Sequence, residues 1–590
     1  MAETFNINER LTEKLKQMKK IFLHFIFITL SISSTFAQYT RLLHFAGISN
    51  GSNPFGSLIS DGTFLYGMTT EGGASPCSNG CNGSGVIFKI KPDGTGYTKL
   101  HDFDSVNARN PRGSLFSDGT FLYGMTEQGG TNACFGGCGT IFKIKPDGTG
   151  YSNLFNFAGA TNGGYPAGDL ISDGIYLYGM TLQGGTYDYG TIFKIKPNGT
   201  GYTKLYDFDS INGNFPQGSF ISDGTFLYGM TSASSGSGTI FKIKLNGTGY
   251  TVLHNFTGYY PYGDGNYPFG NLISDGTFLY GMTSGGGLND NGVIFKIKPD
   301  GTGYDSLLSF NGANGSRPWS SFISDGNFLY GLTSQGGTGI NCPSYSCGVL
   351  FKIKSDGTEY AKLYDFDGIN GSNPNGTLFS DGIFLYGMTM YGGTNDDGVI
   401  FKNCVAHYTT SYDSIQDIFT LNVDSNITAL ATSYHWDFGD GTSSTLATPS
   451  HTYTANTVYN ICMKIYLSSG DSCIYCHIMG KDSSGIITRD PGFTINVRNA
   501  NSPADISQTF SNETNIEVFP NPTSGIFQIA NTNYQISNIE VYNLLGELVH
   551  QHRGAFSNLQ INLANQPNGI YFLNIKTKQG TISKKLIINK

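Results

Sequence analysis

The sequence predicts an all-β protein whose largest part is a seven-bladed β-propeller. Glycine supplies 81 of the 590 residues and aromatic residues 14%, whereas charged residues supply only 13%. This balance favours short strands joined by glycine turns. A Ser-Asp-Gly motif also returns at steps of 57, 55, 50, 52, 50 and 56 residues, and its copies begin at Ser60, Ser117, Ser172, Ser222, Ser274, Ser324 and Ser380. A period of this length is typical of repeat architectures.

Each repeat contains four strand-like pieces separated by Pro-Asp-Gly, Asn-Gly or Gly-Gly turn signals. In the second copy these pieces cover residues 97–103, 113–116, 121–126 and 139–145. Four short strands in each period predict one propeller blade per repeat. The alternative is an open solenoid of seven units.

The order of the strands within a blade follows from the size and polarity of their side chains. The piece that begins with Pro-x-Gly is expected to be innermost, because strands near the axis need small residues. The apolar Leu-Tyr-Gly-Met-Thr piece is expected second, the alternating Phe-Lys-Ile-Lys piece third and the Tyr-Thr-Lys-Leu piece outermost. The glycine of Pro-x-Gly is replaced by Ser320 in one copy and is otherwise Gly56, Gly113, Gly168, Gly218, Gly270 and Gly376.

This order predicts how the ring closes. The array opens with an outer-strand piece at residues 39–45 and stops after a third-strand piece at residues 399–402. We therefore expect the first strand of the chain to complete the last blade, which leaves no unpaired strand edge between the two ends of the ring.

Residues 1–37 are expected to be a signal peptide region, with Met18 as the start. Lys19 and Lys20 precede an apolar run at residues 21–32, and small residues before Gln38 predict cleavage after Ala37. A transmembrane anchor is the weaker interpretation, because the run is shorter than the roughly 20 apolar residues that cross a bilayer. We expect no transmembrane span in the mature chain.

Charge argues against nucleic acid as a partner. Lys and Arg number 35 and Asp and Glu 43, so the net charge is -8 and no basic stripe is available for a polyanion. No cofactor or metal is expected.

Ten cysteines fit an exported protein in an oxidising compartment. Three close pairs fall at the same point of the repeat and are expected to form local disulfides. Zinc is the alternative, but each pair lies in a different repeat without a histidine nearby. The pairs are Cys77 with Cys81, Cys134 with Cys138, and Cys342 with Cys347.

Residues 38–402 resemble a known repeat family. The segments Pro-x-Gly-Ser-Leu-Ile-Ser-Asp-Gly, Leu-Tyr-Gly-Met-Thr and Gly-Val-Ile-Phe-Lys-Ile-Lys-Pro-Asp-Gly are similar to the GloVer repeat of bacterial exported proteins. The resemblance implies a propeller-like repeat and a surface location, and it implies no activity.

Residues 403–498 resemble a PKD domain, an immunoglobulin-like sandwich. The resemblance rests on Tyr-His-Trp-Asp-Phe-Gly-Asp-Gly-Thr-Ser at residues 434–443 and Pro-Ser-His-Thr-Tyr at residues 449–453. It implies that Trp436 lies in the core. Asp437 and Asp440 suit metal ligands or acids, but Gly-Asp-Gly is first a tight turn whose Asp accepts backbone N–H groups.

Four cysteines belong to this domain. Cys462 and Cys476 flank a predicted hairpin and are expected to pair, which leaves Cys404 and Cys473 as candidate partners. Cys473 and Cys476 also form a C-x-x-C motif, but no βαβ pattern surrounds it, so a redox site is not expected.

Residues 499–514 are polar and are expected to be a linker. Residues 515–590 resemble the type A sorting domain of the type IX secretion system, and we expect this domain to be a small β-sandwich. The motifs that carry this resemblance lie at residues 518–525, 539–546, 569–572 and 584–590. It implies that residues 515–590 engage the type IX secretion machinery, that the protein crosses the outer membrane, and that it is secreted or held at the cell surface.

Catalytic residues are expected to occur in one repeat and not in all seven, since an active site is a single arrangement of particular side chains. The Ser-Asp-Gly aspartates fail this test and are interpreted as turn residues. The Asp-Phe-Asp segments at 102–104, 207–209 and 365–367 hint at calcium loops, but hairpin turns explain them better. We expect no catalytic residue.

The residue between Pro and Gly varies and is expected to ring the mouth of the channel. Such a variable ring on a fixed scaffold is typical of a binding face. Trp319 is the only tryptophan of the propeller and Arg317 precedes it by two residues, which suits stacking on a sugar or a peptide. The alternative is that these rings only plug the channel. The candidate ligand-binding residues are Trp319, Arg317, Phe55, Arg112 and Phe269; Ala167, Gln217 and Asn375 complete the ring.

These observations predict a secreted or cell-surface binding or adhesion protein. Its propeller presents a carbohydrate- or protein-binding face, and its PKD domain acts as a spacer. A propeller-type polysaccharide-degrading enzyme, either hydrolase or lyase, is the alternative.

Overall fold

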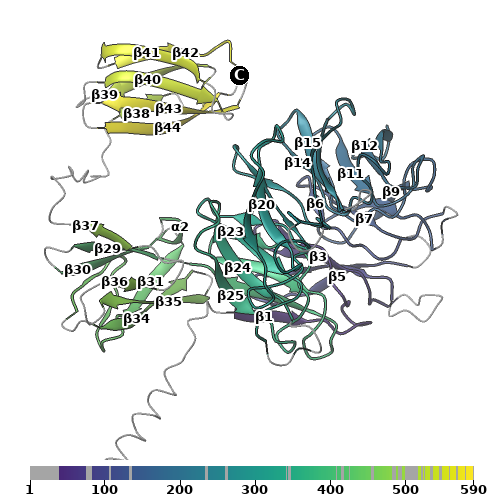
Figure 1. Cartoon of the computed structure of the whole chain (residues 1–590), viewed down its shortest axis with the longest axis horizontal. Helices are drawn as coiled ribbons and strands as arrows, with labels where there is room; N and C mark the ends of the chain where they lie inside the picture. The colour runs from purple at the N-terminus through teal and green to yellow at the C-terminus, as the bar shows by residue number, and fades with distance from the viewer. Residues whose placement is uncertain are drawn as a thin grey trace, which may run out of the picture. The chain divides into compact units, whose positions relative to one another are not determined.

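In the computed structural model the described part of the chain consists of β-strands joined by turns and loops, with one short helix (Figure 1). The described residues are 39–588, with gaps at 75–82, 105–107, 132–133, 135, 233–236, 259–262, 340–341, 343–346, 407, 414–416, 424, 429, 454–456, 469, 482–486, 490–494, 499–515, 520–522, 524, 532–535, 544–547, 557, 567–568 and 578–579. The predicted signal peptide and the pair Cys77 and Cys81 lie outside them. Within the described ranges no helix is long and apolar enough to cross a membrane.

Residues 39–404 form seven four-stranded antiparallel sheets, the blades of a β-propeller. Blades 1 to 3 contain β2 (Ile59–Ser60), β3 (Leu65–Thr69), β4 (Val86–Ile90) and β5 (Thr98–Asp102); β6 (Phe116–Ser117), β7 (Leu122–Thr126), β8 (Thr140–Ile144) and β9 (Ser152–Asn156); and β10 (Ile171–Ser172), β11 (Leu177–Thr181), β12 (Thr191–Ile195) and β13 (Thr203–Asp207). Blades 4 to 6 contain β14 (Ile221–Ser222), β15 (Phe226–Thr231), β16 (Thr239–Lys244) and β17 (Thr251–Asn255); β18 (Ile273–Ser274), β19 (Leu279–Thr283), β20 (Val293–Ile297) and β21 (Asp305–Ser309); and β22 (Ile323–Ser324), β23 (Phe328–Thr333), β24 (Val349–Lys354) and β25 (Ala361–Asp365).

Blade 7 confirms the predicted closure. It contains β26 (Phe379–Ser380), β27 (Phe384–Thr389) and β28 (Val399–Cys404), and β1 (Tyr39–His44) from the start of the chain pairs with β28 as its outermost strand. In Figure 1 the purple β1 lies by the green strand β25, and the Tyr39 ring stacks on Tyr364 of β25 at 3.9 Å between centroids. The solenoid alternative is therefore excluded.

The predicted inner glycines form a closed contact ring around the axis. A Cβ built on each of these glycines would lie 2.2 or 2.3 Å from the carbonyl oxygen of the equivalent residue in the next blade, which is Ser320 for Gly270 and glycine elsewhere. Gly376 of blade 7 meets Gly56 of blade 1 in this way. Glycine is thus required by the close approach of neighbouring main chains. Ser320 takes the same place in blade 6 and exchanges two hydrogen bonds with the main chain of Leu332.

A ring of polar side chains, absent from the sequence prediction, follows the glycine ring. The residue after each of these glycines, or after Ser320, donates its backbone N–H to the side-chain oxygen of its counterpart in the next blade. Ser57 donates to Ser114 at 2.9 Å, and Thr377 donates to Ser57 at 2.7 Å and so completes the circle. The members in order are Ser57, Ser114, Asp169, Ser219, Asn271, Ser321 and Thr377. These bonds satisfy inner-strand donors that have no ladder partner on the channel side.

The Ser-Asp-Gly aspartates fix turns. Asp173, for example, accepts hydrogen bonds from the N–H groups of Ile175 at 2.8 Å and Tyr176 at 2.7 Å and from the Tyr178 hydroxyl at 2.8 Å. Although partial burial raises the pKa of Asp173, these hydrogen bonds outweigh it and hold the pKa below the usual value. The same bonds recur in all seven blades, as a structural role requires.

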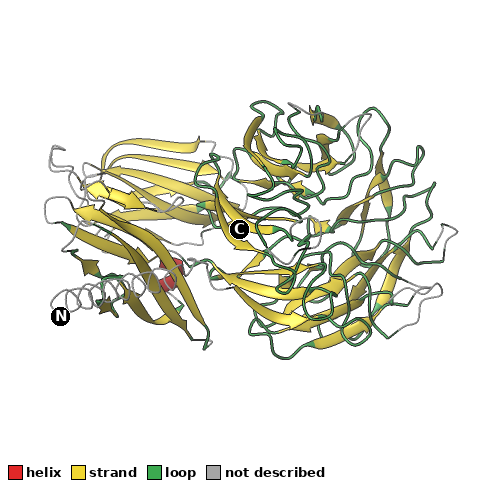
Figure 2. Cartoon of the chain, turned by 60° about the horizontal axis from the view of Figure 1, so that its bottom comes forward, coloured by secondary structure: helices red, strands yellow, loops and turns green. Residues whose placement is uncertain are grey.

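The PKD domain is a sandwich of two sheets. One contains β33 (Ser450–His451), β30 (Ile418–Val423), β29 (Tyr408–Asp413) and β37 (Ile495–Arg498), and the other β32 (Ser443–Ser444), β31 (Ala431–Asp437), β34 (Val458–Leu467), β35 (Ser472–Lys481) and β36 (Ile487–Arg489). The short helix α2 (Ser425–Thr428) is red in Figure 2.

The PKD motif residues have core and turn roles. Trp436 is fully buried and donates its indole N–H to the Leu446 carbonyl at 2.8 Å. Asp437 accepts from the Gly439 N–H, and Asp440 accepts from Thr442, so both carboxylates hold the Gly-Asp-Gly turn. A disulfide joins Cys462 to Cys476.

The propeller and the PKD domain are linked by direct contacts. The sequence named Cys404 and Cys473 as candidate disulfide partners, but it did not indicate that they belong to two different domains. A disulfide joins Cys404, at the end of β28, to Cys473 of β35. Lys402 forms an ion pair with Asp471 at 2.7 Å, and the Lys352 ammonium lies 3.4 Å from the Tyr475 hydroxyl. Residues of both domains share one hydrophobic core. The PKD domain is therefore held against blades 6 and 7 by direct contacts. A spacer attached only through a linker would have no such contacts.

Lys352→Met is expected to stabilise the protein at neutral pH and to reduce the pH dependence of its stability. Burial lowers the pKa of Lys352 to about 8, an effect that the positive charge of Lys354 reinforces and Asp325 and Glu359 oppose. In the unfolded chain a lysine has a pKa of about 10.4. Between these values the unfolded chain binds a proton that the folded chain lacks, so the free energy of unfolding rises with pH.

Urea unfolding between about pH 7.5 and 9.5 should show this rise in the wild type and a flatter profile in Lys352→Met. Lys194→Met is the control, because Lys194 holds the same position in blade 3 but is only half-buried. Equal profiles in the wild type and Lys352→Met would contradict the expectation.

The second compact unit starts at Ala500 and contains the sorting domain. Its two sheets contain β38 (Ile516–Phe519), β39 (Ile526–Asn531) and β42 (Asn558–Asn562), and β41 (Leu548–Phe556), β40 (Ile536–Asn543), β43 (Gly569–Thr577) and β44 (Gly580–Ile588). Phe527, Ile539 and Leu573 belong to its own core. The unit is the small C-terminal β-sandwich that the sequence predicts.

Candidate ligand-binding face of the propeller

One face of the propeller carries all the Pro-x-Gly motifs, and we call it the proline face. Because the strands of each blade alternate in direction, the loops after the second and fourth strands also open on this face. The Ser-Asp-Gly turns and the Pro-Asp-Gly turns lie on the opposite face. The variable residues of Pro-x-Gly thus lie where the loops of all seven blades converge.

The structure brings four of the five predicted site residues into one cluster. The Trp319 ring lies 5.0 Å from that of Phe269 in the neighbouring blade and 6.1 Å from that of Phe55, measured between centroids. The Arg112 guanidinium lies 5.4 Å from the centre of the Phe55 ring. All four side chains are half-buried, so each keeps a part of its surface accessible.

Glu127 belongs to this cluster but is absent from the sequence prediction. Its carboxylate lies 2.9 Å from the Arg112 guanidinium. Burial raises the pKa of Glu127, and the charges of Arg112 and Arg109 oppose this rise. The sequence did contain a clue to this role, because Glu127 is the one acidic residue at its position of the repeat. The other blades have Thr70, Leu182, Ser232, Ser284, Ser334 and Met390 there. The ion pair holds the guanidinium in place beside Phe55.

Arg317, the fifth predicted residue, is exposed and lines a pocket between blades 5 and 6. The pocket has a volume of about 290 Å³. The Tyr267 ring forms a further aromatic wall of this pocket, which the sequence prediction missed. Its centroid lies 6.1 Å from that of the stacked Phe269 ring, and the residue is 46% exposed. The lining residues are Asn266, Tyr267, Phe269, Ser284, Gly285, Asp290, Arg317 and Trp319.

The residue before each of these prolines has a left-handed backbone, although residues before proline normally favour extended conformations. The seven φ angles lie between 51° and 57°. Arg317 shows the cause, since its N–H donates to Asn291 of the neighbouring blade at 2.9 Å and its carbonyl accepts from the Ser334 hydroxyl at 2.6 Å. Such strain persists only where the surroundings impose it. The residues are Asn53, Asn110, Tyr165, Phe215, Tyr267, Arg317 and Asn373.

Exposed apolar side chains gather on the proline face. Of the eight large hydrophobic residues that are exposed among the described part of the propeller, only Ile175 lies on the opposite face. A concentration of exposed apolar side chains on one face favours an interaction site on that face. The seven on the proline face are Ile48, Tyr187, Ile211, Tyr267, Leu288, Ile369 and Tyr391.

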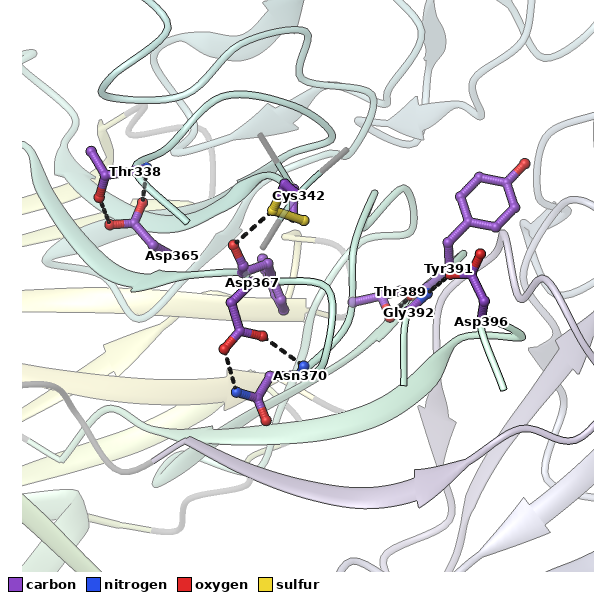
Figure 3. The surroundings of a disulfide bond; sticks show 11 residues. Thr338, Cys342, Asp365, Asp367, Asn370, Thr389, Tyr391, Gly392 and Asp396 are labelled. Carbon is purple, nitrogen blue, oxygen red and sulfur yellow. Dashed lines mark hydrogen bonds between the residues drawn. A yellow bond between two sulfur atoms is a disulfide. The ribbon is translucent and has the colours of Figure 1, made fainter. Parts of the chain in front are cut away.

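Two loops of this face are each closed by a disulfide. The structure pairs Cys134 with Cys138 and Cys342 with Cys347, both after the second strand of a blade. Figure 3 shows the surroundings of the Cys342 disulfide, where Asp365 accepts from the Thr338 hydroxyl at 2.9 Å and Asp367 accepts from the Asn370 amide at 2.8 Å. Asp367 is thus engaged within its own loop, whereas Asp365, at the end of β25, holds the neighbouring loop that follows β23. The described residues contain no group of three or more His, Cys, Asp or Glu placed to hold a metal ion.

The fold defines the class of this protein as an exported, multi-domain β-propeller protein with a PKD domain and a secretion sorting domain. The model of the Gloeobacter/Verrucomicrobia repeat matches residues 28–136, 117–278 and 234–429, and the chain belongs to this repeat family. The PKD domain model matches residues 406–477, and the secretion system C-terminal sorting domain model matches residues 517–589. The sorting domain implies the type IX secretion machinery and export across the outer membrane, to the cell surface or the medium.

Similar solved structures are distant. An extracellular domain from B. thetaiotaomicron is 12% identical with a TM-score of 0.40, and the match covers 78% of this chain but only 59% of that one. An oligogalacturonate lyase in complex with manganese is 12% identical with a TM-score of 0.40, covering 63% and 94%. TolB from Acinetobacter baumannii is 12% identical with a TM-score of 0.29, covering 58% and 80%. No curated protein matches the sequence.

Proposed function

We propose that the mature protein, from Gln38 onwards, is a surface binding or adhesion protein that contacts an extracellular glycan or protein through its proline face. In this proposal residues 1–37 are removed as a signal peptide. The propeller occupies residues 38–402, the PKD domain 403–498, the linker 499–514 and the sorting domain 515–590.

One observation carries the proposal: the two faces of a nearly symmetric propeller differ in apolar exposure. In the part of the propeller that the structure describes, seven of the eight exposed large hydrophobic side chains lie on the proline face. Solubility alone would not favour one face over the other, so the asymmetry supports a ligand on that side. The half-buried cluster of Trp319, Phe269, Phe55 and Arg112 lies at the centre of the same face. Aromatic and arginine anchors at the centre of a surface are typical of binding hot spots.

The double substitution Phe55→Ala and Trp319→Ala is expected to weaken binding at least about tenfold, because each ring is an anchor whose loss costs about 1 kcal/mol or more. The purified mature chain is tested on an array of glycans and extracellular-matrix proteins, and affinities are then measured for the hits. Ile175→Ser on the opposite face is the control and should bind like the wild type.

Two outcomes would refute the proposal. One is the absence of any hit for the wild-type chain. The other is turnover of a polysaccharide by the wild type, which would favour the enzyme alternative. Circular dichroism of the double variant separates lost binding from lost folding.

A further inference from the structure

We infer that the pocket between blades 5 and 6 binds one uncharged hexopyranose ring of a glycan. The inference rests on the proposed function and names the ligand class of one part of the proline face. It concerns the pocket lined by Tyr267, Phe269, Trp319, Arg317 and Asp290.

The size of the pocket favours a single ring. Its volume of about 290 Å³ lies at the lower end for small-molecule sites in proteins. An extended peptide would need a longer groove or a free strand edge. The inner strands beside this pocket, β18 and β22, are each only two residues long and are paired in their own sheets.

Three aromatic rings form two walls of the pocket. Tyr267 and Phe269 stack with their planes 17° apart, whereas the Trp319 ring is inclined by 60° to Phe269. The faces of these rings carry partial negative charge. A pyranose presents polarised C–H groups on its faces, so it complements such a wall while its hydroxyl groups point to the edges.

The rest of the lining supplies both hydrogen-bond donors and acceptors, as sugar hydroxyls require. Asp290 accepts the Gly286 N–H at 2.8 Å, and the Asn266 amide donates to the Gly258 carbonyl at 3.0 Å. These bonds hold both side chains in place before a ligand arrives, which lowers the entropic cost of binding. Ser284 and Arg317 complete the polar lining.

The pocket has one positively and one negatively charged side chain, and this balance argues against an anionic ligand. Arg317 is the cation of the lining and Asp290 its anion. A sulfated or phosphorylated ligand would meet the Asp290 carboxylate as well as the Arg317 guanidinium. An uncharged sugar instead uses the guanidinium as a donor and the carboxylate as an acceptor.

The pocket depends on residues that differ from the equivalent residues of the other blades. Gly285 has no side chain where five of the other six blades have a long one, and blade 4 has Ala233; the five are Glu71, Gln128, Gln183, Gln335 and Tyr391. A Cβ at Gly285 would lie 1.9 Å from the Asn266 side-chain oxygen, so glycine is required for Asn266 to hold its position. Trp319 and Arg317 are likewise unique to this site among the seven blades. Such departures distinguish a site from a shared scaffold.

The test uses the full mature chain and methyl hexopyranosides of glucose, galactose and mannose as probes. Saturation-transfer NMR should detect contact with at least one of them, and titration should give a millimolar affinity. Tyr267→Asn and Arg317→Asn are each expected to weaken this affinity about fivefold, through a lost stacking wall or a lost donor. Asparagine occurs at the equivalent left-handed position in three other blades, as Asn53, Asn110 and Asn373, so both variants should fold.

Gln217→Ala is the matched control, because Gln217 holds the Trp319 position in blade 4 and does not line the pocket. No contact with any hexoside at tens of millimolar would overturn the inference, as would equal affinities of the wild type and both asparagine variants. The proposed function would survive either result if the array still gave hits that depend on Phe55 and Trp319. A chain that gave no array hit would instead refute the proposed function itself.

Discussion

A chain that begins at Gly47, and so lacks β1, is expected to lose its native ring and to aggregate. Phe45 is fully buried and the Tyr39 ring lies between Tyr364 and Phe401, so the deletion removes core aromatic contacts as well as a strand. Loss of one buried Phe side chain alone typically costs about 3 to 5 kcal/mol. The deletion also leaves β28 as an open edge strand, which favours pairing with other chains.

Thermal unfolding and size-exclusion chromatography measure this effect. A synthetic peptide of residues 38–46, added in trans, should restore part of the melting temperature if the loss reflects the missing strand. An unchanged melting temperature in the shortened chain, together with a monomeric elution profile, would show that ring closure by β1 contributes little to stability.

Gly168→Ala is expected to destabilise the propeller by about 3 kcal/mol or more, at the upper end of overpacking effects. The new Cβ would lie 2.2 Å from the Gly218 carbonyl oxygen, and main chain cannot move aside as a flexible side chain does. Any shift of blade 3 away from blade 4 would also stretch the hydrogen bond from the Asp169 N–H to Ser219 in the polar ring.

Urea unfolding gives the change in stability. Ala167→Ser, at the neighbouring variable position, is the control and should change the free energy of unfolding by less than about 1 kcal/mol. A Gly168→Ala variant as stable as this control would mean that the blades separate at little cost and that the glycine ring is not a tight contact.

The order of the strands in each blade and the closure by β1 were predictable because they depend on local rules repeated seven times. Apolar residues on both faces of Leu-Tyr-Gly-Met-Thr mark a strand that is covered on both sides, and β3 and β7 are indeed buried along their whole length. The glycine of Pro-x-Gly marks the axis, since only there do neighbouring main chains approach so closely. The chain order of the pieces then determined which strand completes blade 7.

Part of the candidate site was also predictable. The variation at Phe55, Trp319 and Phe269 within a constant Pro-x-Gly frame indicated a convergent ring, and the structure brings these rings together. Tyr267 and Glu127 were missed, although they too break the repeat, because no local pattern says which variable positions face one another. That relation depends on how adjacent blades are rotated about the axis.

The sequence by itself determined the number of blades, the strand order, the closure and the sorting domain, since each follows from residue patterns within a repeat or a domain and from the order of these patterns along the chain. Only the tertiary structure decided the polar ring that begins at Ser57, the packing of the PKD domain against blades 6 and 7, and the pocket beside Gly285. The physical reason is common to all three. Each consists of contacts between residues from different blades or domains, and side-chain periodicity encodes burial within an element but not the neighbour that the element meets.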